Sequence, residues 1–380
     1  MDSTKVGRQN ARPLGSAPLS LYTALMSEPS KEPAETPVHR RRPRYAGRNP
    51  RRFEDKYKEH NPELYPEAVS KVVASGKTPA GTHRPIMVAE ILEVLAPKPG
   101  ELAVDCTLGY GGHAREILTR LQPGGRLIGL DADPVELPKT EARLRALGFG
   151  PEVFTTVRSN FAGLPQVLAA NGIPAADVIL ADLGVSSMQL DDPKRGFSVK
   201  YEGPLDMRMN PQRGQPASAL LEKISPEALA VMLVENADEP YARPVAEAIA
   251  GRRFAMTTAL ATAIRTALPR LSPDSRDLSV RRIFQALRIA VNDEFSALDT
   301  FLRHLPSCLS PGGRVAILTF HSGEDRRVKK AFSEGLRNHS YASISHEVLR
   351  PTAAERHSNP RSGPAKLRWA IRSIVESLNP

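Results

Sequence analysis

The sequence contains no run of 18 apolar residues, which excludes a transmembrane helix of ordinary length. Its first residues lack an apolar segment followed by a small-residue cleavage site, so we do not expect secretion. Cysteine is almost absent. Cys106 and Cys308 are too few for a cysteine-rich zinc site, and their apolar surroundings predict buried, reduced thiols. These absences favour a cytoplasmic protein without a membrane partner, with organellar targeting as the less favoured alternative.

The residues that are present have the composition of an ordinary globular protein. Hydrophobic residues make up 41% of the 380 residues and charged residues 25%, which excludes a wholly disordered, collagen-like or disulfide-rich chain. The length allows either one enlarged domain or two domains. We find no internal repeat.

Positive charge is concentrated near the start of the sequence. The net charge is +10, and residues 1–82 contribute +6 of it. Seven arginines and no acid lie in Arg40–Arg52. Since residues 1–82 are rich in Pro, Ser and Arg and lack sustained periodicity, we expect a largely disordered basic extension, with a short helix near Pro66–Ala74. A basic run of this kind suits nucleic acid or another anionic surface, and a solvated leader without function is the alternative.

From His83 the sequence alternates between short apolar runs and amphipathic helical stretches. This alternation predicts an α/β fold with a parallel sheet and helices on both faces. The predicted strands are Glu101–Cys106, Arg126–Leu130, Glu152–Val157, Asp177–Ala181 and Arg314–Phe320, and the predicted helices are Val88–Leu95, Ala114–Leu121 and Leu164–Ala170. The tail Lys366–Ser373 is typical of a late antiparallel strand.

The alternation stops after about residue 205, where helical stretches follow one another without a strand between them. They are Pro226–Val234, Arg243–Arg252 and Thr258–Leu268, followed by one long helix, Ile283–Leu305. We therefore predict an α/β core made of residues 83–212 and 283–380. A helical insert at residues 213–282 interrupts this core.

A glycine-rich turn follows the first predicted strand and leads into a helix. It includes GYGGH at 109–113, and glycines at such a turn let the backbone approach a ligand beside free helix N–H groups. Asp131 ends the next strand 22 residues after Gly109, where a carboxylate can accept hydrogen bonds from ribose hydroxyls. The pattern also fits a dinucleotide-binding enzyme, or glycines that serve only strand–helix packing.

The end of a later strand distinguishes nicotinamide chemistry from S-adenosylmethionine chemistry. Asp182 ends this strand, and Gly184, Ser186 and Ser187 follow shortly after it. A dehydrogenase needs an acid–base partner for a carbonyl, commonly His, Lys or Tyr, whereas methylation of an exocyclic amine needs acceptors that hold the amine. The sequence favours the methyltransferase.

Seven longer blocks carry a specific resemblance to a known family. They are VDCTLGYGGHA at 104–114, LIGLDADP at 127–134, DLGVSSMQLDDPKRGFS at 182–198, GPLDMRMNP at 203–211, FQALRIAVNDE at 284–294, FHSGEDRRVKK at 320–330 and NPRSGPAKLR at 359–368. From about His83 to Ile374 the sequence resembles the bacterial 16S ribosomal RNA cytosine-N4 methyltransferases of the RsmH or MraW type. The resemblance implies a class I, Rossmann-like methyltransferase fold with a helical insert, and we expect the insert at residues 213–282 to recognise RNA. It also implies S-adenosylmethionine as cofactor and, as substrate, a cytosine of small-subunit ribosomal RNA near the decoding centre.

The resemblance further implies the residues of the cofactor site. They are Gly111, Gly112, His113, Asp131, Phe161, Asp182 and Gln189. Phe161 is expected beside the adenine, with a plain core aromatic as the alternative. The sequence departs from the family's pattern at Tyr110, at Gly323, at residues 279–282 and in a shorter segment between residues 332 and 359. These departures concern the expected RNA contacts rather than the cofactor site.

The target amine is a poor nucleophile because its lone pair is delocalised into the ring, so we expect direct in-line transfer to a positioned base. The base must leave any stack to be reached. We expect Asp182 to hold the amine together with Ser186. The candidates to hold the base or its phosphates are Ser186, Ser187, Asp206, Arg208 and His321. An Asp206–Arg208 ion pair and a helix-capping His321 are the structural alternatives.

Several further expectations concern ligands and partners. With RNA as the expected substrate, we interpret the arginine run Arg40–Arg52 as an RNA-binding arm. Arg326 and Arg327 are predicted in the first turns of a helix, where they can contact phosphates. No metal is expected, because His113 has no second His or acid at ligand spacing. The expected partner is small-subunit ribosomal RNA or the assembling small subunit, and a homodimer is one option for the oligomeric state. A catalytically idle RNA-binding assembly factor, a methyltransferase for another RNA, and a small-molecule enzyme stay open as alternatives.

Overall fold

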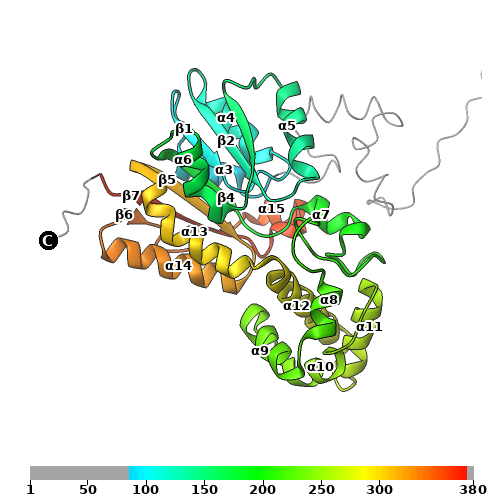
Figure 1. The fold of residues 1–380 in the computed structure, drawn as a ribbon. Helices are drawn as coiled ribbons and strands as arrows, with labels where there is room; N and C mark the ends of the chain where they lie inside the picture. Colours follow the sequence, from blue (N-terminus) through cyan, green and yellow to red (C-terminus); the bar gives the residue numbers. More distant parts are fainter. Residues whose placement is uncertain (1–84, 375–380) are drawn as a thin grey trace, which may run out of the picture. The chain divides into compact units, whose positions relative to one another are not determined.

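The computed structural model describes residues 85–374, so the extension at residues 1–82 and its predicted short helix lie outside the described residues (Figure 1). Seven strands form one sheet in the order β3-β2-β1-β4-β5-β7-β6. They are β1 Leu102–Asp105, β2 Arg126–Asp131, β3 Phe154–Arg158, β4 Ala176–Asp182, β5 Leu309–Thr319, β6 Tyr341–Ile344 and β7 Lys366–Arg372. Strands β1 to β5 pair in parallel, and β7 pairs antiparallel with β5 and β6. The predicted parallel strands and antiparallel tail strand are confirmed, whereas β6 was not predicted.

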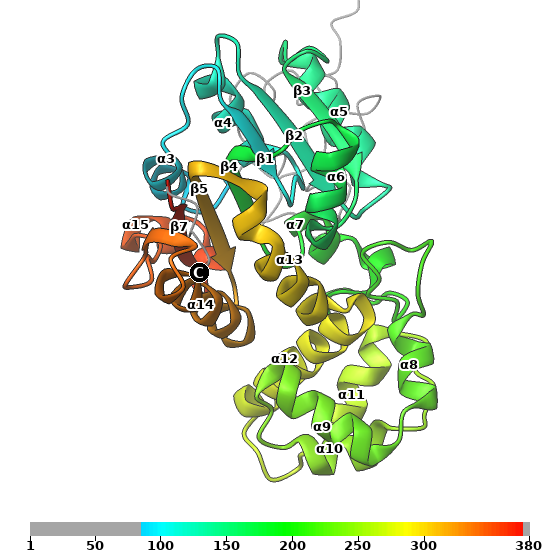
Figure 2. The same ribbon diagram turned by 60° about the vertical axis from the view of Figure 1, so that its left-hand side comes forward.

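Helices cover both faces of this sheet (Figures 1 and 2). One face carries α3 Val88–Leu95, α4 Gly112–Leu121 and α5 Glu136–Ala146, and the other carries α6 Leu164–Ala170, α13 Glu294–Cys308 and α14 Ser322–Arg337. Neighbouring residues of a strand point to opposite faces, so Ala103 packs with the first group and Val104 with the second. Burial on both faces explains why the strands appear in the sequence as continuous apolar runs.

Shorter elements lie in the connections. They are α7 Ser187–Asp191, α15 Ala353–Ser358 and the 3₁₀ turns η2 Phe161–Gly163, η3 Pro193–Arg195 and η4 Pro360–Ser362. No helix within residues 85–374 is long and apolar enough to span a membrane.

A second group of helices gathers away from the sheet (Figure 1). It consists of α8 Ala217–Lys223, α9 Pro226–Ala237, α10 Ala242–Ile249, α11 Thr257–Ala267 and α12 Pro273–Asn292. The three predicted helices of the insert are confirmed, and α8 was not predicted. Leu205 and Leu287, on either side of the predicted insert, are buried in the same apolar cluster as these helices. The boundaries at residues 212 and 282 stay a prediction.

The single long helix predicted over Ile283–Leu305 is wrong. The structure has two helices, α12 and α13, separated by Asp293, whose backbone is left-handed with φ 50° and ψ 41°. Aspartate tolerates this conformation better than most residues, so apolar periodicity continues across a break that the pattern alone does not reveal. The first helix also starts ten residues earlier than predicted, at Pro273. There the side chain of Ser272 accepts a hydrogen bond from the amide of Ser275.

Candidate active site

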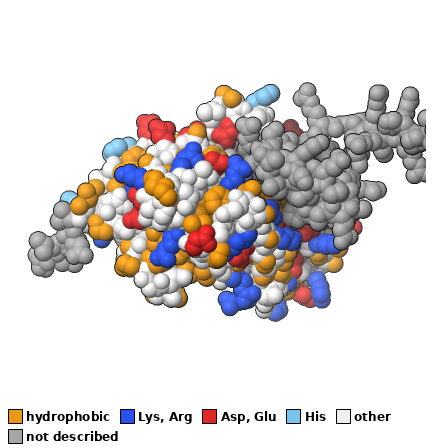
Figure 3. Space-filling model, turned by 90° about the horizontal axis from the view of Figure 1, so that it is seen from above, with side chains coloured by type: hydrophobic (Ala, Val, Ile, Leu, Met, Phe, Trp, Pro, Cys, Tyr) orange, Lys and Arg blue, Asp and Glu red, His pale blue; other side chains and the backbone are white. Residues whose placement is uncertain are grey.

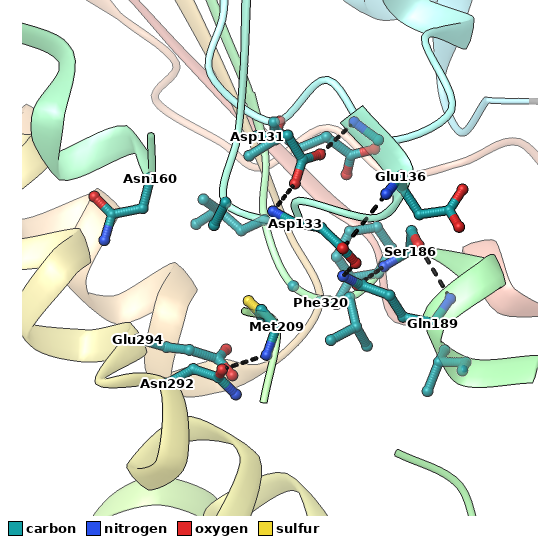
Figure 4. A pocket seen from close by; sticks show the side chains of 18 of the residues that line it. Asp131, Asp133, Glu136, Asn160, Ser186, Gln189, Met209, Asn292, Glu294 and Phe320 are labelled. Atoms are coloured by element: carbon teal, nitrogen blue, oxygen red, sulfur yellow. Dashed lines mark hydrogen bonds between the residues drawn. The ribbon is translucent and has the colours of Figure 1, made fainter. Parts of the chain in front are cut away.

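A cavity of about 1140 Å³ lies beyond the carboxyl ends of β1, β2 and β4 (Figure 4). This is the edge of an open parallel sheet where ligands bind. Its wall also includes Arg208–Asn210 from the loop after α7 and Asn292–Glu294 from the junction of α12 and α13. The cavity therefore lies between the strand ends and segments next to the second helical group.

Most of the predicted site residues line this cavity, and three do not. Those that line it are Gly112, His113, Asp131, Phe161, Asp182, Ser186, Ser187, Gln189 and Arg208. Gly111, Asp206 and His321 are absent from its wall.

The glycine turn after β1 is closely packed against its neighbours. Gly111 has φ 80°, and a Cβ built there would lie 2.9 Å from the Cγ2 atom of Thr140. A Cβ at Gly112 would overlap the ring of Pro85. Close packing therefore excludes a side chain at either position, and strand–helix packing as the only role of these glycines stays a prediction. The backbone of Gly112 still faces the cavity at the start of α4, where helix N–H groups are free to meet a ligand.

Asp131 is held in place by the backbone around it. One carboxylate oxygen accepts a hydrogen bond from the amide of Gly109 at 2.8 Å and the other from the amide of Asp133 at 2.8 Å. Burial raises the pKa of Asp131 from 3.8 to about 6, and burial does the same for Asp105 at the end of β1. Asp131 lines the cavity, so a positively charged ligand there would stabilise its ionised form, whereas Asp105 is buried outside the wall.

Asp182 and His113 form the next part of the wall. The Nε2 atom of His113 lies 3.5 Å from Oδ2 of Asp182, and this buried nitrogen makes no hydrogen bond within residues 85–374. The side chain of Asp182 is 29% exposed, so the carboxylate is open to the cavity. The amide of Asp182 donates to the hydroxyl of Thr107 at 2.6 Å, which fixes the end of β4 beside the glycine turn.

Ser186 and Gln189 cap helix α7. The amide of Gln189 donates to the Ser186 hydroxyl at 3.2 Å, and the amide of Ser186 donates to the side-chain oxygen of Gln189 at 3.0 Å. The Gln189 side-chain nitrogen donates to Asp133 at 2.8 Å. Both side chains therefore have structural partners in addition to their place in the wall.

Phe161 agrees with both interpretations given to it. Its ring is half-buried and meets Phe301 of α13 edge-on, with the ring centroids 5.5 Å apart. It also lines the cavity at the end of β3. A ring whose edge packs against the core can offer a face to a flat ligand.

Asp206 and His321 make the contacts that the two structural alternatives predicted, an ion pair with Arg208 and a helix cap. Arg208 donates to both carboxylate oxygens of Asp206, at 2.8 and 2.7 Å. Burial alone would raise the pKa of Asp206, but these hydrogen bonds outweigh it and hold the pKa below its usual range. His321 is the N-cap of α14 and accepts the amide of Glu324 at Nδ1, 3.4 Å away. Only Arg208 of these three lines the cavity.

The two arginines predicted as phosphate contacts are engaged with protein carboxylates. Arg326 lies 3.1 Å from a carboxylate oxygen of Asp238 at the end of α9. Arg327 lies 3.3 Å from Asp299 and stacks over the ring of Phe295 at 3.7 Å. Their contact with phosphate stays a prediction.

Several residues of the wall were not singled out from the sequence. They are Asp133, Asn160, Met209, Arg288, Asn292, Glu294 and Phe320. Asp133 belongs to the DADP block and Arg288, Asn292 and Glu294 to the FQALRIAVNDE block, so the blocks contained the signal. Because the sequence pattern does not reveal the break at Asp293, the FQALRIAVNDE block was expected to be only a helix, and its place in the cavity wall was not predicted.

One group of potential metal ligands occurs within residues 85–374. Atoms of Glu294, His321 and Glu324 lie within 4.8 Å of one another. Arg288 donates to both oxygens of Glu294, at 2.8 and 2.9 Å, and thereby supplies a positive charge at this position. We interpret the group as a buried charge network and propose no metal there.

Comparisons with known proteins agree with this geometry. The model of the MraW methylase family matches residues 80–373. The chain is 48% identical over 358 residues to ribosomal RNA small subunit methyltransferase H 1 of Lachnoclostridium phytofermentans, covering 92% of this chain and 97% of that protein. It is 49% identical over 342 residues to ribosomal RNA small subunit methyltransferase H 2 of Alkaliphilus metalliredigens, covering 88% and 97%.

These alignments correct one expectation about the first 82 residues. Residues 83–380 make up less than four fifths of the chain, so an alignment over 92% of it also includes part of residues 1–82. The resemblance therefore begins earlier than His83. With its sheet order, its cavity and the match over residues 80–373, the fold is that of a class I methyltransferase, and the chain belongs to the MraW methylase family.

Proposed function

We propose that this protein transfers a methyl group from S-adenosylmethionine to the exocyclic N4 of a cytosine in small-subunit ribosomal RNA of the 16S type. Family membership and the names of the relatives support a ribosomal RNA substrate. The observation that carries the proposal is the cavity. It places the carboxylates of Asp131 and Asp182 at the strand ends and an arginine, Arg208, in the opposite loop.

The residues of the cavity fit the cofactor. When bound, S-adenosylmethionine supplies a methyl group on a cationic sulfonium. Asp131 suits the ribose, and Phe161 suits one face of the adenine. The amide of Gly112 and the side chains of His113, Asp182 and Gln189 complete the proposed cofactor contacts. Gly111 supports them by holding the turn, because it lies outside the cavity wall and its amide donates to the carbonyl of Leu108 at 2.7 Å. Ligand pockets commonly have volumes of about 300–1,000 Å³. A volume of about 1140 Å³ leaves room for a nucleotide beside the cofactor.

In this proposal, Asp182 acts on the target amine. Its partly exposed carboxylate accepts hydrogen bonds from the amine protons, with the hydroxyl of Ser186 as a second acceptor. These contacts turn the nitrogen lone pair out of the ring plane and offset the positive charge that develops on N4 as the bond to the methyl carbon forms in place of the carbon–sulfur bond. The carboxylate of Asp182 then accepts one of the two amine protons, which leaves N4 neutral. Holding the amine at about 3–3.5 Å from the methyl carbon supplies much of the rate enhancement. Ser187, Arg208 and His321 stay proposed contacts of the base or its phosphates. Asp206 lies outside the wall and acts by holding Arg208.

The decisive experiment maps methylated nucleosides by mass spectrometry in small-subunit ribosomal RNA from cells with and without the gene. We expect N4-methylcytidine to disappear without the gene, to return with the wild-type protein and to stay absent with Asp182→Asn. An unchanged modification in the deletion strain would refute the proposal. A loss confined to another RNA would identify a different substrate, and full rescue by Asp182→Asn would refute the role of Asp182. Thermal unfolding of Asp182→Asn verifies that the variant is folded.

The location and assembly of the protein belong to the same proposal. We expect it in the cytoplasm, acting on naked small-subunit RNA or on an assembling subunit. The homodimer stays a prediction. A catalytically idle assembly factor is the alternative, and failure of the folded Asp182→Asn variant to restore the modification would count against it. Thermal stabilisation by S-adenosylmethionine but not by NAD would count against a nicotinamide enzyme.

A further inference from the structure

Arg195 lies behind the cavity and makes contacts with two separate parts of its wall. Its side chain is 12% exposed and belongs to the turn η3. One guanidinium nitrogen donates to the carboxylate of Asp133 at 2.7 Å. The other donates to the backbone carbonyl oxygens of Met209 at 2.9 Å and Arg208 at 3.2 Å. Arg195 thus joins the loop after β2 to the loop after α7.

The Asp133 end of this connection belongs to the cofactor half of the site. Asp133 is 1% exposed and follows Asp131 by two residues. Its carboxylate also accepts hydrogen bonds from the amide of Val135 at 2.9 Å and from the side chain of Gln189 at 2.8 Å. Loss of Arg195 would leave these neutral donors in place but remove the charge that compensates a buried carboxylate.

The other end is a loop with an unusual backbone. Met207 is fully buried and has φ 65°, a conformation that a residue with a side chain adopts only when its surroundings impose it. The amide of Met207 donates to the carbonyl of Arg195 at 3.1 Å. From the opposite side, Asn292 accepts the amide of Met209 at 2.7 Å and donates to the carbonyl of Met207 at 2.8 Å. Arg195 and Asn292 therefore hold the loop between them.

We propose that Arg195 is a positioning residue, which fixes the wall formed by Arg208 and Met209 at a set distance from the cofactor half of the cavity. It does not line the cavity, so it acts through the residues it holds. The inference rests on the proposed function in taking RNA as the molecule that meets this wall. It follows that loss of Arg195 should impair the positioning of the base and its phosphates more than the binding of the cofactor.

The chain contains a matched ion pair that lacks this connection. Arg314 has a side chain 14% exposed, pairs with Glu101 at 2.7 Å and donates to the carbonyl oxygens of Leu95 and Ala96. It therefore has nearly the same burial and the same kinds of partner as Arg195. Glu101 directly precedes β1, and Arg314 lies where β5 runs beside the start of β4. The pair is therefore at the amino ends of the parallel strands, on the edge of the sheet opposite the cavity.

The test compares Arg195→Gln, Arg195→Lys and Asp133→Asn with the control Arg314→Gln. Amide hydrogen exchange at residues 205–210 measures the loop without any need for activity. We expect exchange there to become at least tenfold faster in Arg195→Gln and to stay unchanged in Arg314→Gln. We expect kcat for RNA to fall about 10- to 100-fold in Arg195→Gln, while the Kd for S-adenosylmethionine changes less than threefold. Arg195→Lys should recover part of the loss.

The double variant Asp133→Asn/Arg195→Gln separates coupling from simple destabilisation. If the two residues act as one unit, the double variant is no slower than Arg195→Gln alone. The inference is overturned if loop exchange in Arg195→Gln equals that in Arg314→Gln, or if cofactor affinity falls in parallel with kcat. Failure of the proposed function would look different, because the wild-type protein would then not methylate the RNA while the exchange result would still stand.

Discussion

The backbone amide of Gly109 donates a 2.8 Å hydrogen bond to the carboxylate of Asp131, which ties the turn after β1 to the end of β2. The two residues are 22 positions apart in the sequence, and the parallel pairing of β1 with β2 brings them together. The same carboxylate receives the amide of Asp133. The acid proposed for the ribose is thus fixed before any ligand arrives.

Replacement of Asp131 should weaken cofactor binding strongly. Asp131→Ala removes the proposed ribose acceptor and also the acceptor for two backbone amides, so the turn loses its support. Hydrogen bonds to charged groups are worth about 1.5–3 kcal/mol, which corresponds to a Kd for S-adenosylmethionine raised about 10- to 100-fold. Calorimetric titration measures this. Asp131→Asn keeps one acceptor oxygen and should lie between the wild type and Asp131→Ala, and equal affinities for all three proteins would contradict the assignment.

Cofactor affinity should rise with pH between 5 and 7.5. Burial raises the pKa of Asp131 and Asp105 to about 6 in the free protein, so both are largely protonated at pH 5. A cationic ligand favours the ionised form. We therefore expect the Kd for S-adenosylmethionine to fall about tenfold over this range for each group that must ionise. Asp131→Asn should flatten the profile, and a Kd independent of pH in the wild type would refute the prediction.

The stability of the free protein gives a second measurement of the same raised pKa values. Both lie above the ordinary value of 3.8, so the folded state binds more protons than the unfolded state between about pH 4 and 6. The contribution of the two carboxylates to the free energy of unfolding is therefore full below about pH 4 and is lost as the pH rises through 6. Chemical denaturation of wild type and Asp105→Asn at several pH values measures it. The variant should lose less stability across this window than the wild type.

Much of the fold was predictable because the relevant signals are local. The strands buried on both faces appear as apolar runs such as Asp177–Ala181, and the glycine turn marks the junction of β1 with α4. The break at Asp293 was not predictable by pattern, since the apolar spacing of α12 continues into α13. Strand β6 was missed because it has four residues and pairs only with β7.

The site was predictable in its strand ends and less so elsewhere. Asp131 and Asp182 end strands of one parallel sheet, so their convergence follows from topology. Asn292 and Arg195 reach the loop at Met207–Met209 from 83 and 14 positions away, through contacts that only tertiary packing creates. Residue type alone also did not tell which member of the Asp206–Arg208 pair faces the cavity.

Replacement of Asn292 by Asp should loosen the loop that carries Met207 and Met209. The amide nitrogen of Asn292 donates to the carbonyl of Met207 at 2.8 Å, and a carboxylate cannot donate there. We expect a loss of about 1–3 kcal/mol in the free energy of unfolding, together with a lower kcat for RNA. Asn236→Asp is the control, because Asn236 donates to the carbonyl of Ala286 away from the cavity. A kcat equally reduced in both variants would show that Asn292 has only a structural role.

Two exposed arginines at the cavity should contribute to RNA binding. Arg213 and Arg281 line the cavity and have no carboxylate partner within residues 85–374. Removing one arginine–phosphate ion pair should reduce the log–log salt slope of RNA affinity by about 0.7. We therefore expect Arg213→Gln and Arg281→Gln to bind small-subunit RNA more weakly and with a shallower slope. Arg303→Gln, at an exposed arginine outside the cavity, is the control, and equal effects in all three would indicate general electrostatics instead.

Removal of residues 1–82 should weaken RNA binding more than any single arginine. These residues hold a net charge of +6 of the total +10, and seven arginines lie within Arg40–Arg52. On the face shown in Figure 3, Lys and Arg side chains of the described residues are mixed with Asp and Glu rather than gathered in one patch. If about five of the arginines contact phosphates, the log–log salt slope of RNA affinity should be shallower by about 3.5 for a chain that starts at His83.

Filter binding at several salt concentrations measures this slope, and cofactor affinity is the control. The truncated chain should bind S-adenosylmethionine as the full chain does, because every proposed cofactor contact lies after residue 82. A full-length variant with the seven arginines of Arg40–Arg52 replaced by Gln should reproduce the truncation, since the prediction concerns their charge. If either variant keeps both the RNA affinity and the slope of the full chain, the arginine run is a solvated leader. RNA binding would then depend on residues around the cavity such as Arg281.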